Sequence, residues 1–246
     1  MNRSIAIAAS IAALVCAAAA SAAQSIAPEI AAAVADAARP AADKERDANR
    51  KPAEVVAFAG VKSGMVIAEL NPGGGYFTRI LSKAVGPRGK VFAVLTAGAA
   101  GRPGAQDNMN KMKADYPNVT YVVTDYAAMM LPEKADLIWT TENYHDFHNG
   151  ATANVPGLNK AVFDNLKPGG IFYVEDHNAA DGAGLEAASK FHRMDLAVAK
   201  TELTAAGFKV DAEGNALRNP ADNRASSNSE SGHFSSDRFM LRLKRP

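Results

Sequence analysis

The most constraining feature of this sequence is the alternation of short apolar runs with longer helical patterns along most of the chain. Runs rich in valine and isoleucine, without polar alternation, are typical of strands buried on both faces, as in parallel sheets. They predict strands at residues 65–70, 90–95, 119–124, 135–140, 170–175, 208–212 and 238–243. Helices are predicted at residues 43–59, 77–85, 106–116, 159–166 and 185–206. This order predicts a Rossmann-like, doubly wound α/β sheet, mostly parallel, whose last strand forms an antiparallel edge.

The composition excludes several classes of protein. The chain has 246 residues, of which 48% are apolar and 22% charged, and its formal net charge is +1. These values are typical of a globular protein and argue against collagen, wholesale disorder and a multi-span membrane protein. A nearly neutral chain also gives no reason to expect a nucleic-acid partner. Cys16 is the only cysteine, which excludes an intrachain disulfide and a thiolate zinc site.

The first 23 residues have the order of a secretory signal peptide. Arg3 precedes an apolar run over residues 5–20, and the small-residue sequence ASA follows at residues 20–22. We therefore expect a signal peptide at 1–23, an alanine-rich, loose or helical arm at 24–42 and one domain at 43–246. Export to a bacterial periplasm or beyond follows, with no stable membrane insertion after cleavage. An uncleaved anchor is the alternative.

A glycine-rich turn follows the first predicted strand. The sequence reads ELNPGGGY from Glu69 to Tyr76 and leads into a predicted helix. Glycine lets the backbone turn sharply and lets a ligand approach it closely, and the next helix presents unpaired N–H groups there. The turn is not a kinase-type phosphate loop, and Thr78 stands where a dinucleotide fingerprint has its third glycine. A plain tight turn between strand and helix is the alternative.

This turn resembles the first motif of class I S-adenosylmethionine-dependent methyltransferases. Glu69, Gly73 and Gly75 match its acidic-x-Gly-x-Gly-x-Gly pattern, with Asn71 in place of the first glycine. The sequence LKPGG at residues 166–170 resembles the turn that the family often has before its fifth strand. More narrowly, RKPAE at 50–54, YHD at 144–146 and DH at 176–177 resemble a group of exported predicted methyltransferases. The resemblance covers residue 43 to the C-terminus and implies the family's seven-stranded sheet.

The resemblance implies where the methyl donor, S-adenosylmethionine, would bind. Glu69 would hold the donor's ammonium group or organise water around it, and Gly73 with Gly75 would admit the amino-acid and ribose portions. Asn71, in the first glycine's position, belongs to the same implied site. The stretch 139–144, which contains Asn143, would line the methyl-donating face.

The nucleoside half of the donor would meet the second and third strands. Asp125 and Tyr126 match the place where an acidic side chain usually meets the adenine amino group. The acid that normally binds both ribose hydroxyls is replaced by Leu95, which accepts no hydrogen bond. Thr96 would supply one weaker contact. This departure, together with the signal peptide, brings donor binding into question.

Polar side chains gather where the fourth and fifth strands end. His145, Asp146 and His148 follow the fourth strand, and Asp176 with His177 follows the fifth. Neighbouring ends of parallel strands point into one crevice, so these groups are expected to converge. We predict His145 as general base, oriented by Asp146 or Asp176, with His177 as the alternative base. The alternative is that these histidines only form hydrogen bonds with the backbone of their loops. The five residues are also possible metal ligands, but no metal site is assigned.

Three functions are compatible with this sequence. The first is a methyltransferase that uses S-adenosylmethionine and acts on a small-molecule acceptor. The second is an exported, non-catalytic ligand-binding protein on the same fold, which Leu95 and the signal peptide favour. The third is a metal-dependent hydrolase built on the histidine and aspartate cluster. The pattern identifies neither the acceptor nor the oligomeric state.

Overall fold

A seven-stranded sheet forms the centre of the described part of the protein. The structure is a computed structural model that describes residues 25–228 and 235–246. The strand order is β3-β2-β1-β4-β5-β7-β6. The strands are β1 Val66–Leu70, β2 Lys90–Leu95, β3 Val119–Val123, β4 Ala135–Thr141, β5 Leu166–His177, β6 Lys209–Gly214 and β7 Arg238–Lys244. Strands β1 to β5 pair in parallel and β7 runs antiparallel to both neighbours, which confirms the predicted sheet.

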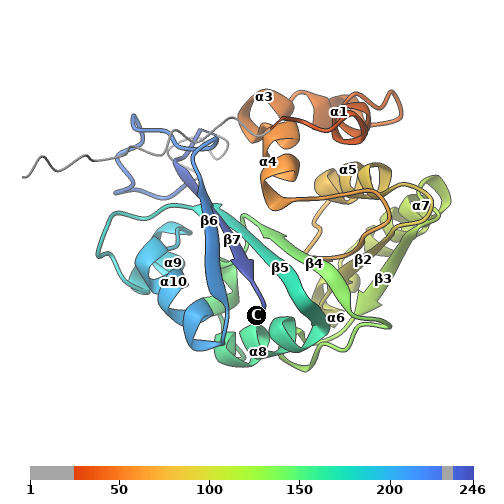
Figure 1. Ribbon diagram of the computed structural model, residues 1–246. Coiled ribbons are helices and arrows are strands. Elements are labelled where there is room, and N and C mark those ends of the chain that lie inside the picture. Colours follow the sequence, from red (N-terminus) through yellow and green to blue (C-terminus); the bar gives the residue numbers. More distant parts are fainter. Residues whose placement is uncertain (1–24, 229–234) are drawn as a thin grey trace, which may run out of the picture.

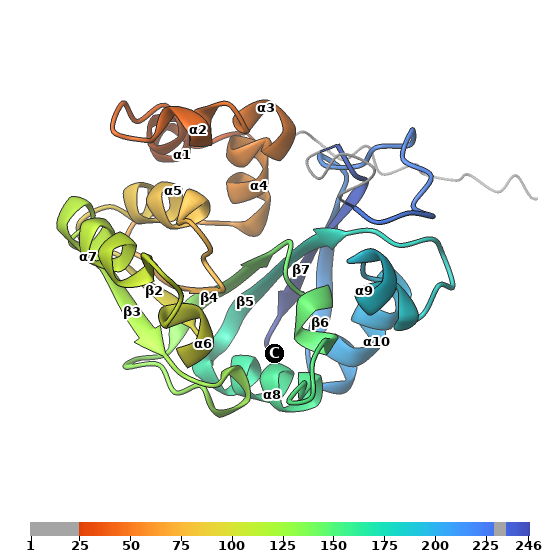
Figure 2. The ribbon, with the colours of Figure 1, turned by 180° about the vertical axis from the view of Figure 1, so that it is seen from behind.

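Helices cover both faces of this sheet (Figure 1). They are α1 Pro28–Val34, α2 Ala41–Lys44, α3 Asp47–Arg50, α4 Pro52–Ala59, α5 Tyr76–Val85, α6 Ala97–Ala100, α7 Ala105–Asp115, α8 Val155–Asn165, α9 Glu186–Phe191 and α10 Leu196–Ala205. Helices α1, α4, α5 and α7 pack on one face, and α8 and α10 pack on the other, as the reverse view in Figure 2 also shows. Each face therefore has its own apolar core.

The strands at the centre of the sheet are buried on both sides. All five residues of β1 are buried, and Trp139 on β4 and Tyr173 on β5 have no exposed surface. Their rings pack at 4.4 Å between centroids, and Phe77 of α5 lies 4.9 Å from Trp139. Apolar side chains on both faces explain why these strands show no polar alternation in the sequence. The rigid centre fixes the strand ends that carry the polar residues.

The helix predicted over residues 43–59 is interrupted. It consists of α2, α3 and α4, and Lys51 between the last two has a left-handed conformation with φ 42°. Lys51 precedes Pro52, and the proline ring disfavours the helical conformation for the residue before it. The break is thus a local effect of one proline.

Residues 25–42, for which a loose or helical arm was expected, contain helix α1. Helix α1 packs against α5 and buries Ile30 and Ala33, which are 2% and 3% exposed. Arg39 forms an ion pair with Asp47, with 2.6 Å between Nη2 and Oδ1. The alanine-rich composition concealed a helix with one apolar face. The predicted signal peptide at 1–23 lies outside the described residues.

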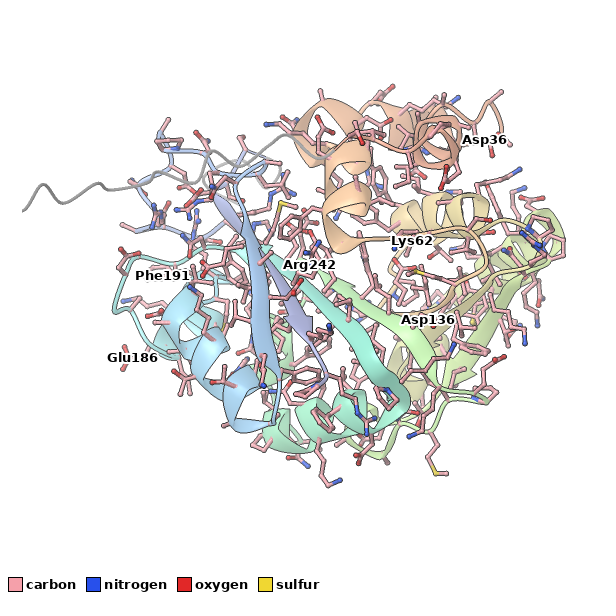
Figure 3. The ribbon with its side chains drawn as sticks, in the orientation of Figure 1. Asp36, Lys62, Asp136, Glu186, Phe191 and Arg242 are labelled. Atoms are coloured by element: carbon pink, nitrogen blue, oxygen red, sulfur yellow. The ribbon has the colours of Figure 1, made fainter. Side chains whose placement is uncertain are left out.

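The helix predicted over residues 185–206 is also broken in two. Helix α9 ends at Phe191, which is labelled in Figure 3, and His192 follows with φ 50°. Helix α10 begins after Asp195, whose carboxylate accepts a hydrogen bond from the backbone N–H of Ala197. Asp195 is therefore an N-cap in the middle of the predicted helix, and it starts a new helix there.

Among the described residues, no helix is long and apolar enough to span a membrane.

Candidate functional site

The glycine-rich turn lies at the carboxyl end of β1, as predicted. Asn71, Gly73 and Gly75 all have positive φ values of 51°, 55° and 80°. A β-carbon at Gly73 would meet nothing within 4 Å, so the backbone here borders open space. At Gly75 a β-carbon would lie 2.3 Å from Cε of Met112. Gly73 therefore leaves room for a ligand, whereas glycine at Gly75 is favoured by its positive φ, since the methyl group of Met112 is the end of a flexible side chain.

A small hollow opens at this turn. Its volume is about 230 Å³, and it is lined by residues of the turn, of α3 and of the end of β4. Glu69 lines it while being only 3% exposed, and Oγ1 of Thr78 donates a 2.5 Å hydrogen bond to its Oε2. Burial raises the pKa of Glu69 to about 7, against the opposing effects of that hydrogen bond and of Arg50 and Arg79. The carboxyl is therefore poised between its two protonation states at neutral pH.

One wall of the hollow is an ion-pair network. Glu142, directly after β4, lies 2.6 Å from Nη2 of Arg50 and 2.7 Å from Nη1 of Arg238. Arg238 also lies 3.3 Å from Glu175 and donates to the backbone carbonyl of Asn49. Glu142 has φ 56°, a strained value for a residue with a side chain. The network brings together residues from α3, β4, β5 and β7 (Figure 1).

Two asparagines and a tyrosine border the hollow toward the second and third strands. Nδ2 of Asn71 donates a 2.6 Å hydrogen bond to Oδ1 of Asn143 and so links the ends of β1 and β4. Tyr126 forms a hydrogen bond with the backbone of Asn71, and burial raises the pKa of its phenol to about 12. These three residues were all predicted to contact the donor. They lie together, and Nδ2 of Asn143 donates to the backbone carbonyls of Thr141 and Asn71.

A larger cavity lies beyond this border. Its volume is about 500 Å³, and it is lined from the end of β2, the end of β3 and the segment between β4 and α8. Three of its lining residues, Thr96, Asp125 and Tyr126, were predicted for the nucleoside half of the donor. Asp125 also accepts a hydrogen bond from the backbone N–H of Ala127. Leu95 ends β2 and is 6% exposed, so no carboxylate is present at that position.

His145 and the two aspartates predicted to orient it converge. His145 begins the 3-10 turn η2, His145–His148, and its Nδ1 lies 2.8 Å from Oδ1 of Asp176. Its Nε2 lies 3.3 Å from Oδ1 of Asp146, which lines the larger cavity. Burial alone would lower the pKa of His145, but the charges and hydrogen bonds of both aspartates outweigh it and raise that pKa to about 10. The ring therefore holds a proton at neutral pH when only protein surrounds it.

His177 lies apart from the cavities and is a poor candidate for contact with a substrate. Its side chain has no exposed surface, and its Nδ1 lies 2.6 Å from Oγ of Ser236. The reason is its strand: β5 extends through His177, so the ring is covered by the segment before β7. His148 pairs with Glu202 of α10 at 3.0 Å and joins two elements beneath the cavity.

Sequence reasoning missed two features of this site. Glu142 pairs with Arg50 at the wall of the small hollow and also with Arg238, although the three residues are far apart in the chain. The signal in the sequence was an arginine at the start of an otherwise largely apolar last strand. Nothing in the sequence indicated that this arginine pairs with Glu142. His192 lies within the helix that was predicted over residues 185–206 and was not assigned to the site. Its ring instead stands 5.7 Å from that of His145, because α9 ends just before it.

Solved structures share this arrangement of strands and helices. A SAM-dependent methyltransferase from Aquifex aeolicus is 18% identical, with a TM-score of 0.57, over 85% of this chain and 99% of that chain. The N-methyltransferase NodS from Bradyrhizobium japonicum is 16% identical, with a TM-score of 0.55, over 82% and 96%. The (4+2)-cyclase SpnF is 15% identical, with a TM-score of 0.57, over 84% and 81%. No protein-family model and no curated protein matches the chain.

The chain has the class I methyltransferase fold. The strand order with an antiparallel β7 and the likeness to these structures agree with the fold that the glycine-rich turn predicted. At these identities the likeness concerns the fold alone. One of the neighbours is a cyclase by name, which illustrates that a fold supports several chemistries.

Proposed function

We propose that this protein is an S-adenosylmethionine-dependent methyltransferase acting on a small-molecule acceptor. The observation that supports it best is the pair of cavities at the carboxyl edge of the sheet, which divide the predicted donor contacts between them: Asn71 and Asn143 line the hollow, and Asp125 and Tyr126 line the larger cavity. The larger cavity lies within the size range of sites for small molecules, whereas the hollow at the turn is below it. A ligand with a compact charged end and a larger nucleoside would use both.

The residues of the two cavities fit such a donor. In the hollow, Glu69 would bind the donor's ammonium group and Arg46 would bind its carboxylate. The backbone at Gly73, which carries no side chain, would contact the part of the donor between these two groups. In the cavity, Thr96 and Asp125 would contact the nucleoside. When bound, the donor supplies an activated methyl group on sulfonium sulfur. The protein's own contribution is to align the acceptor and to exclude water.

The acceptor would lie beside Asp146. This side chain is 47% exposed, lines the larger cavity and contacts His145. As the acceptor's heteroatom forms its bond to the methyl carbon, its proton would pass to the carboxylate of Asp146, because the ring of His145 is already protonated at neutral pH, and the sulfur would keep the electrons of the broken bond. Export of the protein and cleavage of the signal peptide at 1–23 belong to the same proposal, and the sequence pattern alone supports them.

The alternative is an exported binding protein without catalysis. It is favoured by Leu95, which leaves the end of β2 without a carboxylate for ribose hydroxyls. The two functions differ in whether the donor binds and whether its methyl group leaves.

Calorimetric titration with S-adenosylmethionine and with S-adenosylhomocysteine tests the proposal. We expect dissociation constants in the micromolar range for both ligands. Gly73→Val should weaken binding at least tenfold, because the side chain would occupy the open space of the turn. Gly182→Val is the matched control, since Gly182 also has a positive φ and no neighbour within 4 Å, but lies outside the turn. Absence of heat at millimolar ligand would contradict the proposal and leave the binding protein as the better account.

A further inference from the structure

Three side chains with metal-binding atoms meet at the mouth of the larger cavity. They are His145 and Asp146 of η2 and His192, which follows α9. One ligand atom from each lies within 4.8 Å of the other two. His145 is buried, whereas Asp146 and His192 are 47% and 53% exposed. The cluster therefore consists of one buried residue, His145, and two residues that face solvent, Asp146 and His192.

The separations of these atoms suit joint coordination of one ion. Oδ1 of Asp146 lies 3.3 Å from Nε2 of His145 and 3.6 Å from Nδ1 of His192. Zinc binds nitrogen and carboxylate oxygen at about 2.0–2.2 Å, so two ligands of a tetrahedral site lie about 3.3 Å apart. A small adjustment of the exposed His192 ring would bring all three atoms to bonding distance.

The inner histidine is already oriented as a metal ligand. Nδ1 of His145 is paired with Asp176, which also accepts hydrogen bonds from the backbone N–H groups of His145 and His177. Metal-binding histidines usually donate their second ring N–H to a carboxylate in this way, which fixes the ring and its tautomer. The pairing leaves Nε2 directed at Asp146 and the cavity.

The exposed histidine is held by its backbone. His192 has φ 50° and ψ 50°, a left-handed conformation that histidine adopts more readily than most residues. Its carbonyl accepts a 2.9 Å hydrogen bond from Nδ2 of Asn228. The next residue, Arg193, is fully buried and lies 2.8 Å from Asp222. The turn after α9 is thus anchored on both sides, and the ring of His192 is 53% exposed beside Asp146.

We propose that His145, Asp146 and His192 form a binding site for a divalent transition-metal ion, with Asp176 as the partner that orients His145. Two imidazoles and one carboxylate suit zinc, iron, cobalt or nickel rather than magnesium or calcium, which prefer oxygen ligands. Three protein ligands leave at least one coordination position for water or for a ligand in the cavity that Asp146 lines. An oxygen atom of an acceptor is the chemical group that this open position would take.

Binding of an ion at this site does not require the proposed methyl transfer. With an ion bound, His145 and Asp146 would be its ligands, so the proton of an acceptor oxygen at the open position would pass to water rather than to either side chain. Ion binding can be measured without donor or acceptor. Failure of the metal site would therefore leave donor binding untouched, and failure of donor binding would leave the metal site in place.

The test is titration of the metal-free, tag-free protein with Co²⁺ and with Zn²⁺, followed by calorimetry and by the visible absorption of bound Co²⁺. We expect one ion per chain with a dissociation constant of micromolar or below. His192→Asn should weaken binding at least tenfold, and asparagine tolerates the left-handed backbone, so folding should be preserved. Asp176→Asn should weaken binding about 10–100-fold.

His148→Gln is the matched control, because His148 lies on the same turn but pairs with Glu202. It should bind both ions as the unmodified protein does. The proposal is overturned if the protein binds neither ion at 1 mM, or if His192→Asn binds as tightly as the control. Circular dichroism of each variant shows whether a loss of binding reflects a loss of fold.

Discussion

The two cavities at the carboxyl edge of the sheet are built in opposite ways. The hollow at the glycine-rich turn has a wall of buried ion pairs, in which Glu142 contacts both Arg50 and Arg238. The larger cavity has a half-exposed carboxylate, Asp146, beside a histidine. One is about 230 Å³ and the other about 500 Å³. In the first, the charges of the wall pair with one another, and in the second Asp146 faces the space where a ligand would bind.

This difference gives a criterion for distinguishing charged residues that maintain the shape of a site from those that can contact a ligand. Buried charges that are paired with each other are costly to disturb and maintain a shape. A partly exposed charge in a cavity remains able to contact a ligand. By this criterion Arg238 supports the fold, whereas Asp146 is available for chemistry.

The largest effect is expected from breaking the ion-pair wall. Arg238→Met should lower the free energy of unfolding by about 3–5 kcal/mol, because it removes the arginine that contacts Glu175 and one of the two that contact Glu142. Arg242→Met is the matched control on the same strand. The pair of Arg242 with Asp211 is partly exposed, so its loss should cost about 1 kcal/mol or less. Urea denaturation measures both, and equal losses would contradict the comparison.

The second effect is a dependence of stability and of ligand affinity on pH, which arises from Glu69 in the small hollow. The pKa of Glu69 is raised to about 7, so the fold favours its neutral form. Its contribution to stability is present below about pH 4.5, the ordinary value, and is lost as the pH rises through about 7. A bound ammonium group favours the ionised form, so affinity for S-adenosylmethionine should rise up to about tenfold between pH 6 and pH 8.

Glu69→Gln is the test of this assignment. The amide oxygen can still accept the hydrogen bond from Thr78, but the side chain no longer titrates. Calorimetry of the variant should show an affinity that changes little over the same pH range. A variant with the same slope as the unmodified protein would show that another group controls the binding.

The smallest effect concerns the border between the cavities. Asn71→Gly and Asn71→Ala both remove the hydrogen bond to Asn143, but only alanine is strained at φ 51°. We expect Asn71→Ala to be less stable than Asn71→Gly by about 1 kcal/mol. Both should bind S-adenosylmethionine several-fold more tightly, because the cavities would join. Thermal unfolding and calorimetry measure the two quantities, and weaker binding by both variants would make Asn71 a ligand contact instead.

The sequence predicted the central sheet well because apolar runs dominate it. The observed β2, Lys90–Leu95, coincides with the predicted strand. Helix breaks were predicted less well, since Lys51 and His192 interrupt patterns that are apolar enough to continue. The first break has a visible cause in Pro52. The second depends on Arg193, whose partner Asp222 is distant in the chain.

The candidate site was predicted in its parts but not in its contacts. The ends of β1, β3 and β4 were identified correctly, so Asn71, Tyr126 and Asn143 lie together. Their mutual hydrogen bonds depend on side-chain positions that no spacing specifies. His177 was placed at the right strand end, but the covering segment that buries it follows from tertiary packing.

The contacts of Arg238 have a consequence for the stage of folding at which the small hollow takes its shape. Arg238 lies at the start of the last strand, and it contacts Glu142 in the middle of the chain and the carbonyl of Asn49 near the beginning. These contacts form only once β7 has joined the sheet. Until then Glu142, which lines the small hollow, lacks one of its two arginine partners, so the docking of β7 determines when the hollow takes its final shape.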